Sequence, residues 1–66
     1  MQILVNGKPR HVHDGATVAE LLTSLELDAR QVAVEINLEL APRGEHPSRT
    51  LAPGDRVEVV TLVGGG

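Results

Sequence analysis

The alternation of apolar and polar residues along the chain predicts several short strands and one helix. A period of two places alternate side chains on opposite faces of a strand. Four segments are predicted strands, and the period is clearest in the last two of them, where apolar and mostly β-branched residues recur at every second position; a fifth, shorter segment is a candidate strand. The four segments are 2–5, 8–13, 32–36 and 56–63, and the shorter one is 39–41.

The first two strands are expected to form a hairpin. Asn6 and Gly7 stand between them, and this dipeptide is preferred in two-residue turns because both positions require a positive φ. Pro9 has no backbone N–H to donate, so the second strand is expected at an edge of the sheet.

One helix is predicted after the hairpin. Thr17 and Glu20 have the spacing of a capping box, in which each side chain binds the backbone N–H of the other residue. The turns that follow carry a single apolar stripe, which must cover a sheet. The residues of this stripe are Val18, Leu21, Leu22 and Leu25.

The second half of the chain has weaker local signals. Residues 38–48 contain two prolines and a glycine without a clear period, and we expect mostly loop there. Pro53 and Gly54 occupy the positions that a type II turn favours, and the last strand follows that turn. Both faces of the last strand are largely apolar, which is typical of a central strand.

This element order predicts an α+β protein with a ubiquitin-like β-grasp fold. We expect a mixed sheet of four to five strands, with the one main helix packed on one face and the last strand beside the first. A chain of 66 residues holds a single core. We assign residues 1–63 to the β-grasp domain and 64–66 to a flexible C-terminal glycine tail.

The composition excludes several classes of function. The chain has no cysteine, which excludes disulfides, thiolate metal sites and thiol nucleophiles. It has no aromatic residue and a net charge of −3, whereas nucleic-acid binding uses stacked rings and clustered positive charge. Neither a signal peptide nor a membrane span of about 20 apolar residues is apparent. We therefore expect a cytoplasmic protein without nucleic-acid or membrane partners.

The strongest candidates for metal ligands are His11 and His13, because residues i and i+2 of a strand share a face. Asp14 and His46 are further candidates. Two ligands do not close a site, so we expect exposed histidines and no metal. The chain also lacks a phosphate-binding loop and a dinucleotide motif. We expect no cofactor bound by this chain and no catalytic residue.

The candidate chemistry lies in the tail, Gly64, Gly65 and Gly66. A linker or a frayed terminus is the alternative interpretation. Glycine has no Cβ, so this tail can thread a narrow channel in a partner, and three extended residues reach about 10 Å. A partner that adenylates the terminal carboxylate would turn it into an electrophile for sulfur or amine nucleophiles. The chain would then be a carried substrate.

Several segments together follow the pattern of a known family. They are 1–8, 17–22, 32–37, 42–43, 54–60 and 63–66. In their order, and with this chain length and glycine end, they resemble the ThiS family of sulfur carriers in thiamine biosynthesis. One departure is Leu62, which stands where family members often have an aromatic residue.

The resemblance implies a β-grasp fold and two protein partners. A ThiF-type adenylyltransferase would use ATP and Mg to adenylate Gly66, which would then become a thiocarboxylate. Gly64 and Gly65 would thread into the partner's active site. A ThiG-type thiazole synthase would receive the sulfur for the thiazole ring of thiamine.

A candidate docking patch is predicted on the sheet face that points away from the helix. Leu4, Val60 and Leu62 are the apolar residues expected there, flanked by Arg56 or Glu58. The alternative is that neighbouring side chains partly cover these residues.

Three other functions remain open at this point. The first is a carrier for another pathway, such as a MoaD-like subunit, although such chains approach their glycines through a proline that is absent here. The second is a ubiquitin-like modifier, for which the single Lys8 would limit lysine-linked chains. The third is a ubiquitin-like binding module without covalent chemistry.

Overall fold

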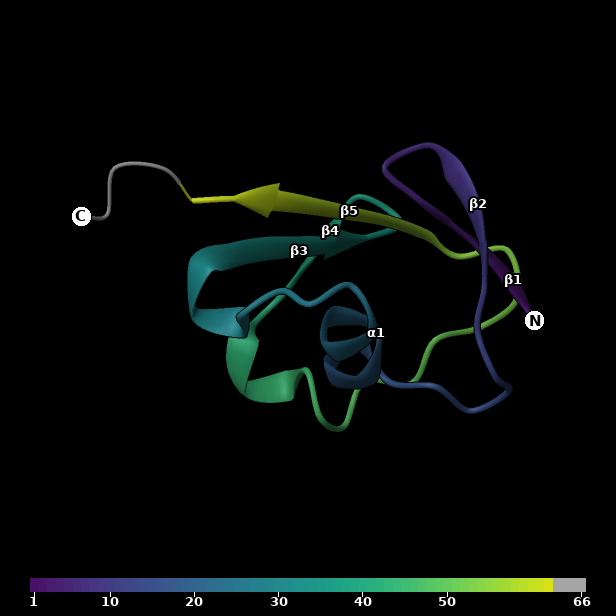
Figure 1. The fold of residues 1–66 in the computed structure, drawn as a ribbon, viewed down its shortest axis with the longest axis horizontal. Coiled ribbons are helices and arrows are strands. Elements are labelled where there is room, and N and C mark those ends of the chain that lie inside the picture. Colours follow the sequence, from purple (N-terminus) through teal and green to yellow (C-terminus); the bar gives the residue numbers. More distant parts are fainter. Residues whose placement is uncertain (63–66) are drawn as a thin grey trace.

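The computed structural model describes residues 1–62, which form a five-stranded mixed sheet with an α-helix against one face (Figure 1). This confirms the predicted fold class. The elements are β1 (Gln2–Val5), β2 (Lys8–His11), α1 (Val18–Ser24), the 3-10 helix η1 (Ala29–Gln31), β3 (Val32–Ile36), β4 (Glu39–Ala41), the 3-10 helix η2 (Arg43–Glu45) and β5 (Arg56–Thr61).

The sheet has the order β2-β1-β5-β3-β4, so the last strand lies at its centre. β5 runs parallel to β1 and antiparallel to β3, and the two hairpins β1–β2 and β3–β4 complete the sheet. Two predictions are confirmed here. The last strand lies beside the first, and β2, which contains Pro9, is an edge strand.

The first hairpin turns at the predicted residues. Asn6 and Gly7 have φ values of 51° and 81°, the left-handed conformation that the turn requires. β2 ends at His11, two residues before the predicted end at His13. The reason is that its partner strand is short: β1 begins at Gln2, which pairs with His11. Only Met1 precedes Gln2, and its carbonyl accepts from the N–H of Val12, so no residue remains to pair with His13.

The capping box of α1 is confirmed. The Thr17 N–H donates to Glu20 Oε1 over 2.9 Å, and the Glu20 N–H donates to Thr17 Oγ1 over 3.2 Å. Two of the backbone donors that every helix start leaves free are thereby satisfied. The helix is only seven residues long and ends at Ser24, with Leu25 as its C-cap.

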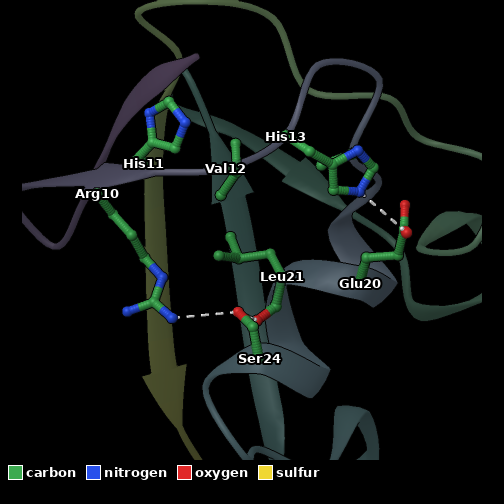
Figure 2. Close-up of a pocket in the computed structure, with 8 residues that line it drawn as sticks. Arg10, His11, Val12, His13, Glu20, Leu21 and Ser24 are labelled. Atoms are coloured by element: carbon green, nitrogen blue, oxygen red, sulfur yellow. Dashed lines mark hydrogen bonds and ion pairs between the residues drawn. The ribbon is translucent and has the colours of Figure 1, made fainter.

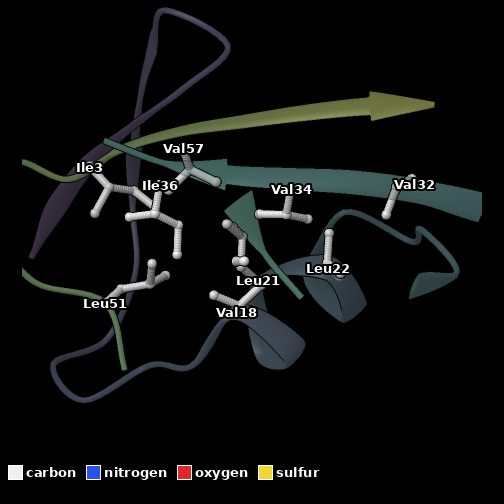
Figure 3. Packing of buried hydrophobic residues seen from close by; sticks show 10 residues of the cluster. Ile3, Val18, Leu21, Leu22, Val32, Val34, Ile36, Leu51 and Val57 are labelled. Carbon is white, nitrogen blue, oxygen red and sulfur yellow. The ribbon is translucent and has the colours of Figure 1, made fainter. Parts of the chain in front are cut away.

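The core lies between α1 and the sheet, and it is built from aliphatic side chains alone (Figure 3). Three residues of the predicted stripe, Val18, Leu21 and Leu22, are buried, and Leu25 is partly buried beside them. They pack against the sheet and against Leu51, which lies in the segment before β5. The remaining core residues are Ile3, Val32, Val34, Ile36, Ala41 and Val57.

The segment after β3 contains more structure than its sequence pattern predicts. The candidate strand at 39–41 forms as β4, and η2 follows it at Arg43–Glu45. His46, next in the chain, is buried, and its Nε2 lies 2.9 Å from the Ala41 carbonyl oxygen. A carbonyl oxygen can only accept, so Nε2 carries the proton. This bond fastens the loop under β4.

The turn before β5 forms as predicted. Gly54 has φ 80°, and the Asp55 N–H donates to the Ala52 carbonyl over 3.1 Å, the bond that closes a four-residue turn. The described residues contain no helix long and apolar enough to cross a membrane. The predicted boundary between residues 1–63 and the glycine tail lies outside the described residues.

Candidate functional site

The structural part of the candidate site is the end of β5, which carries the chain toward the tail (Figure 1). The core-facing residue Val57 is buried, and Val59 is partly buried. Beyond them β5 extends past the helix, and Thr61 is exposed. The Leu62 N–H donates to the carbonyl of Gln31, the last residue of η1, over 2.7 Å. The last described residue is therefore still hydrogen-bonded to the segment that leads into β3. Gly64, Gly65 and Gly66 lie outside the described residues.

Asn6 fixes β5 close to this end. Its side chain makes two hydrogen bonds with the backbone of Val59: Oδ1 accepts from the N–H over 2.8 Å, and Nδ2 donates to the carbonyl over 3.2 Å. The amide therefore continues the β1–β5 ladder after β1 has turned away. Sequence reasoning assigned Asn6 only to the turn. The 53 positions that separate it from Val59 leave no local signal of the contact.

The three residues of the predicted docking patch are not all at the same place on the open sheet face. Val60 and Leu62 have exposed fractions of 58% and 55%. Leu4 is partly buried and lies opposite Arg56. Val60 is four residues further along β5, about 13 Å away at 3.3 Å per residue. Arg56 and Glu58 share the face between the two ends.

Leu4 instead borders a shallow hollow of about 290 Å³ near the start of β5. The other residues that line it are Gly7, Arg56, Val57 and Glu58. Val60 and Leu62 thus remain the apolar residues of the predicted patch that lie next to the tail.

Two further exposed apolar residues, both in the β3–β4 hairpin, were missed by the sequence analysis. Leu40 is 67% exposed, and it pairs with Glu35 of β3 on the same open face as Val60, which pairs with Ala33. Leu38 is 85% exposed in the β3–β4 turn, with φ 71°. The alternation within 39–41 is the signal for Leu40, because Ala41 faces the core and its neighbour must face away.

An ion pair lies beside the end of β5, on η1. Arg30 Nη2 contacts Asp28 Oδ2 at 2.8 Å, and the Arg30 N–H donates to Asp28 Oδ1 over 2.9 Å. The side-chain hydrogen bond from Arg30, supported by the backbone bond, lowers the pKa of Asp28 from 3.8 to about 2. The same contact raises the pKa of Arg30.

A small pocket of about 140 Å³ lies between the end of β2 and α1 (Figure 2). His13 Nε2 contacts Glu20 Oε2 at 3.2 Å on one side of it, and Arg10 Nη2 contacts Ser24 Oγ at 3.3 Å on the other. The backbone bond from Thr17, followed by the bond from His13, lowers the pKa of Glu20.

The candidate metal ligands do not gather at this pocket. His13 lies in the loop after β2, so it does not share a strand face with His11, and His46 is buried under β4. Within residues 1–62 no three His, Asp or Glu side chains are close enough together to hold a metal ion.

The fold and the position of β5 can be compared with known proteins. The model of the ThiS family matches residues 3–66, nearly the whole chain. The chain belongs to the ThiS family. The family match agrees with the resemblance found in the sequence, and it includes residues 63–66, which lie outside the described structure.

Individual ThiS proteins are similar over their full length. The sulfur carrier protein ThiS of Thermus thermophilus is 41% identical over 64 residues, which cover 97% of this chain and 98% of that protein. The crystal structure of the thiamine biosynthesis protein ThiS from Geobacter metallireducens superposes with a TM-score of 0.86 at 39% identity, and all of both chains is covered.

A thiazole synthase of Paramagnetospirillum magneticum is also similar. It is 39% identical over 66 residues, which is all of this chain but 20% of that protein. The chain therefore spans about a fifth of the length of this relative, so that a ThiS-like region there is part of a much longer polypeptide.

Proposed function

We propose that this chain carries sulfur for the thiazole ring of thiamine, with Gly66 as the modified residue. The observation that supports this most is the family match, which runs through β5 and includes the glycines. The chain would act as a protein co-substrate. Its partners would perform the catalysis, and ATP and Mg would be bound by the activating partner.

The chemistry requires two steps at the terminal carboxylate. In the first, a ThiF-type adenylyltransferase lets a carboxylate oxygen of Gly66 attack the α-phosphorus of ATP, and pyrophosphate leaves. In the second, a sulfur nucleophile attacks the carbonyl carbon of the acyl adenylate, and AMP leaves. Where the nucleophile is a persulfide, the product is an acyl disulfide, and a thiol that attacks its distal sulfur breaks the S–S bond, so that the thiocarboxylate leaves and a disulfide forms. Since the first step consumes ATP, we assign the cycle to the cytoplasm.

Glycine suits the tail for a steric reason. A residue without Cβ lets the backbone pass through a channel that a side chain would block. Gly64 and Gly65 would occupy the channel while the folded body docks outside. Three extended residues span about 10 Å, which is enough to reach a buried active site.

We propose a ThiG-type thiazole synthase as the sulfur acceptor. The support is that thiazole synthases from two bacteria contain a region similar to this whole chain, which covers 20% of each. Joining a carrier to its acceptor in one polypeptide raises their effective concentration and favours their contact.

We further propose that the docking patch of Leu4, Val60 and Leu62 has its main contacts at Val60 and Leu62. Both are more than half exposed, and both lie within four residues of Gly64. Apolar residues at the centre of an interface contribute most of its affinity. Leu4, which lies near the start of β5, would contact a partner only at the margin of such an interface.

Removal of Gly66 tests the carrier function. We expect the shortened chain to fold normally but to support no ATP–pyrophosphate exchange by the activating enzyme, because the carboxylate no longer reaches the α-phosphorus. Gly44→Ala is the matched control, since a Cβ there meets no atom within 4 Å. Unchanged exchange with the shortened chain would contradict the carrier function and favour a binding module.

A further inference from the structure

The two edges of β5 are paired with neighbouring strands over different lengths. On one side β5 pairs with β3 from Val57 through Thr61. On the other side β1 pairs with it only at Arg56 and Val57, because β1 is short and turns away at Asn6. The edge toward β1 therefore loses its neighbour well before β5 ends (Figure 1).

The backbone groups of alternate residues point to that edge. The Asp55 and Val57 carbonyls accept from the N–H groups of Leu4 and Asn6, each over 2.9 Å. The side chain of Asn6 then satisfies both backbone groups of Val59. By the alternation of a strand, the next residue whose N–H and C=O point the same way is Thr61.

The backbone of Thr61 has no hydrogen-bond partner on this edge among residues 1–62. Its Cα partner, Val32, belongs to β3 and lies on the opposite edge of β5. The next hydrogen bond on that opposite edge is the one from the Leu62 N–H to the Gln31 carbonyl. Thr61 is also exposed. An unpaired donor and acceptor at a strand edge are a template for another extended chain.

Apolar side chains flank this edge on the open face of the sheet. Val60 and Leu62, the residues on either side of Thr61, are both more than half exposed there. A strand paired at Thr61 would therefore meet apolar contacts on the open face.

We propose that an extended strand of the activating enzyme pairs with β5 at Thr61, in line with β1. This inference rests on the proposed function, which supplies the activating enzyme as the partner that pairs with β5. Thr61 lies just before the tail that this enzyme must draw in, so a strand paired there would set the direction in which the tail leaves. A second copy of the chain is a poorer occupant, since each copy carries a net charge of −3.

Amide hydrogen exchange of the unmodified protein tests this pairing directly. In the free chain we expect the Thr61 amide to exchange quickly and the Val60 amide, which faces β3, to exchange slowly. On addition of the activating enzyme with ATP, the Thr61 amide should become at least tenfold more protected. Unchanged exchange at Thr61, under conditions in which pyrophosphate is released, would overturn the pairing and leave the carrier function intact.

Two variants separate the backbone from the side chain of Thr61. Thr61→Pro removes the N–H, and we expect weaker binding of the activating enzyme by about three- to tenfold, the effect of one lost neutral hydrogen bond. Thr61→Val keeps the N–H and should bind like the parent protein. Thermal unfolding of each variant reports on its fold. Equal losses in both would assign the effect to the side chain and contradict the proposal.

Two further results would also overturn it. Protection of Thr61 that rises with the concentration of the free chain would make a second copy the occupant. Absence of both binding and pyrophosphate release with a competent activating enzyme would remove the proposed function and this inference together.

Discussion

Single polar side chains fasten this small protein at positions that its apolar core does not reach. Asn6 is the main example, because one amide joins the first hairpin to the last strand through two bonds to Val59. His46 does the same for the loop under β4. With no disulfide among the described residues, such contacts must supplement the packing of the aliphatic core.

Asn6→Gly tests the contribution of the amide to stability. Glycine keeps the positive φ of the turn and leaves the backbone bond from residue 6 to the Val57 carbonyl in place. We expect a loss of about 1–2 kcal/mol, from two exposed hydrogen bonds and the greater freedom of glycine in the unfolded chain. Urea unfolding measures this, and an unchanged midpoint would show that the amide adds nothing.

The Asp28–Arg30 pair predicts a particular response to acid. The pKa of Asp28 is lower in the folded state, about 2 against an ordinary 3.8. The unfolded chain therefore binds the proton more readily, and the contribution of Asp28 to stability is present above pH 4 and lost as the pH falls toward 2. Because the pair is exposed, the contribution is small.

Asp28→Asn isolates this effect. We expect the variant to lose less stability than the parent protein between pH 4 and pH 2, because the amide does not titrate. The carboxyl carbon of Asp28, followed by NMR, should titrate near pH 2 in the parent protein. A titration midpoint near the ordinary value would mean that the pair does not form in solution.

At the scale of the elements, the proposed docking patch on the open face of the sheet gives a test of how partners bind. Leu62→Asp should weaken binding to both partner enzymes by about tenfold or more, since a charge would enter the apolar part of the interface. The fold should persist because Leu62 is 55% exposed. Calorimetric titration with each enzyme measures the affinity.

Leu38→Asp is the matched control for that substitution. Leu38 is more exposed than Leu62, but it lies in the β3–β4 turn, beside the start of β5 and far from the tail. We expect its binding to match that of the parent protein. If Leu62→Asp bound both enzymes equally well, the docking patch would be wrong. If both variants bound weakly, the interface would be wider than proposed.

The local elements were predictable because their signals are local. The Asn6-Gly7 turn, the capping box of Thr17 and Glu20, and the Pro53-Gly54 turn each depend on residues a few positions apart, and all three form. Two features were not predictable. The burial of His46 and the bond from Asn6 to Val59 depend on segments that meet only in the folded chain.

The same distinction holds for the candidate site. The pattern of β5 predicts that Val60 and Leu62 face away from the helix, and both are exposed. Their separation from Leu4 could not be predicted, because it depends on the register between β1 and β5. Leu40 was missed although the alternation within 39–41 carries a signal for its exposure, because the strand itself was only a candidate.

At the scale of the whole molecule, the fold holds one strand at the centre of the sheet and leads it outward to the tail. β5 has a neighbour on each side where it begins, and it keeps only β3 where it ends. The anchored half gives the tail a fixed base. In the proposed function, the free half would present a backbone edge and two exposed apolar side chains to the partner enzymes.

The most direct test of this account is the intact mass of the chain after incubation with its activating enzyme, ATP, Mg and a sulfur source. We predict the mass gain expected for replacement of one carboxylate oxygen by sulfur, with fragmentation locating it at Gly66. The chain without Gly66 should remain unmodified. An unchanged mass of the complete chain, with an enzyme that is active on another carrier, would contradict the central claim.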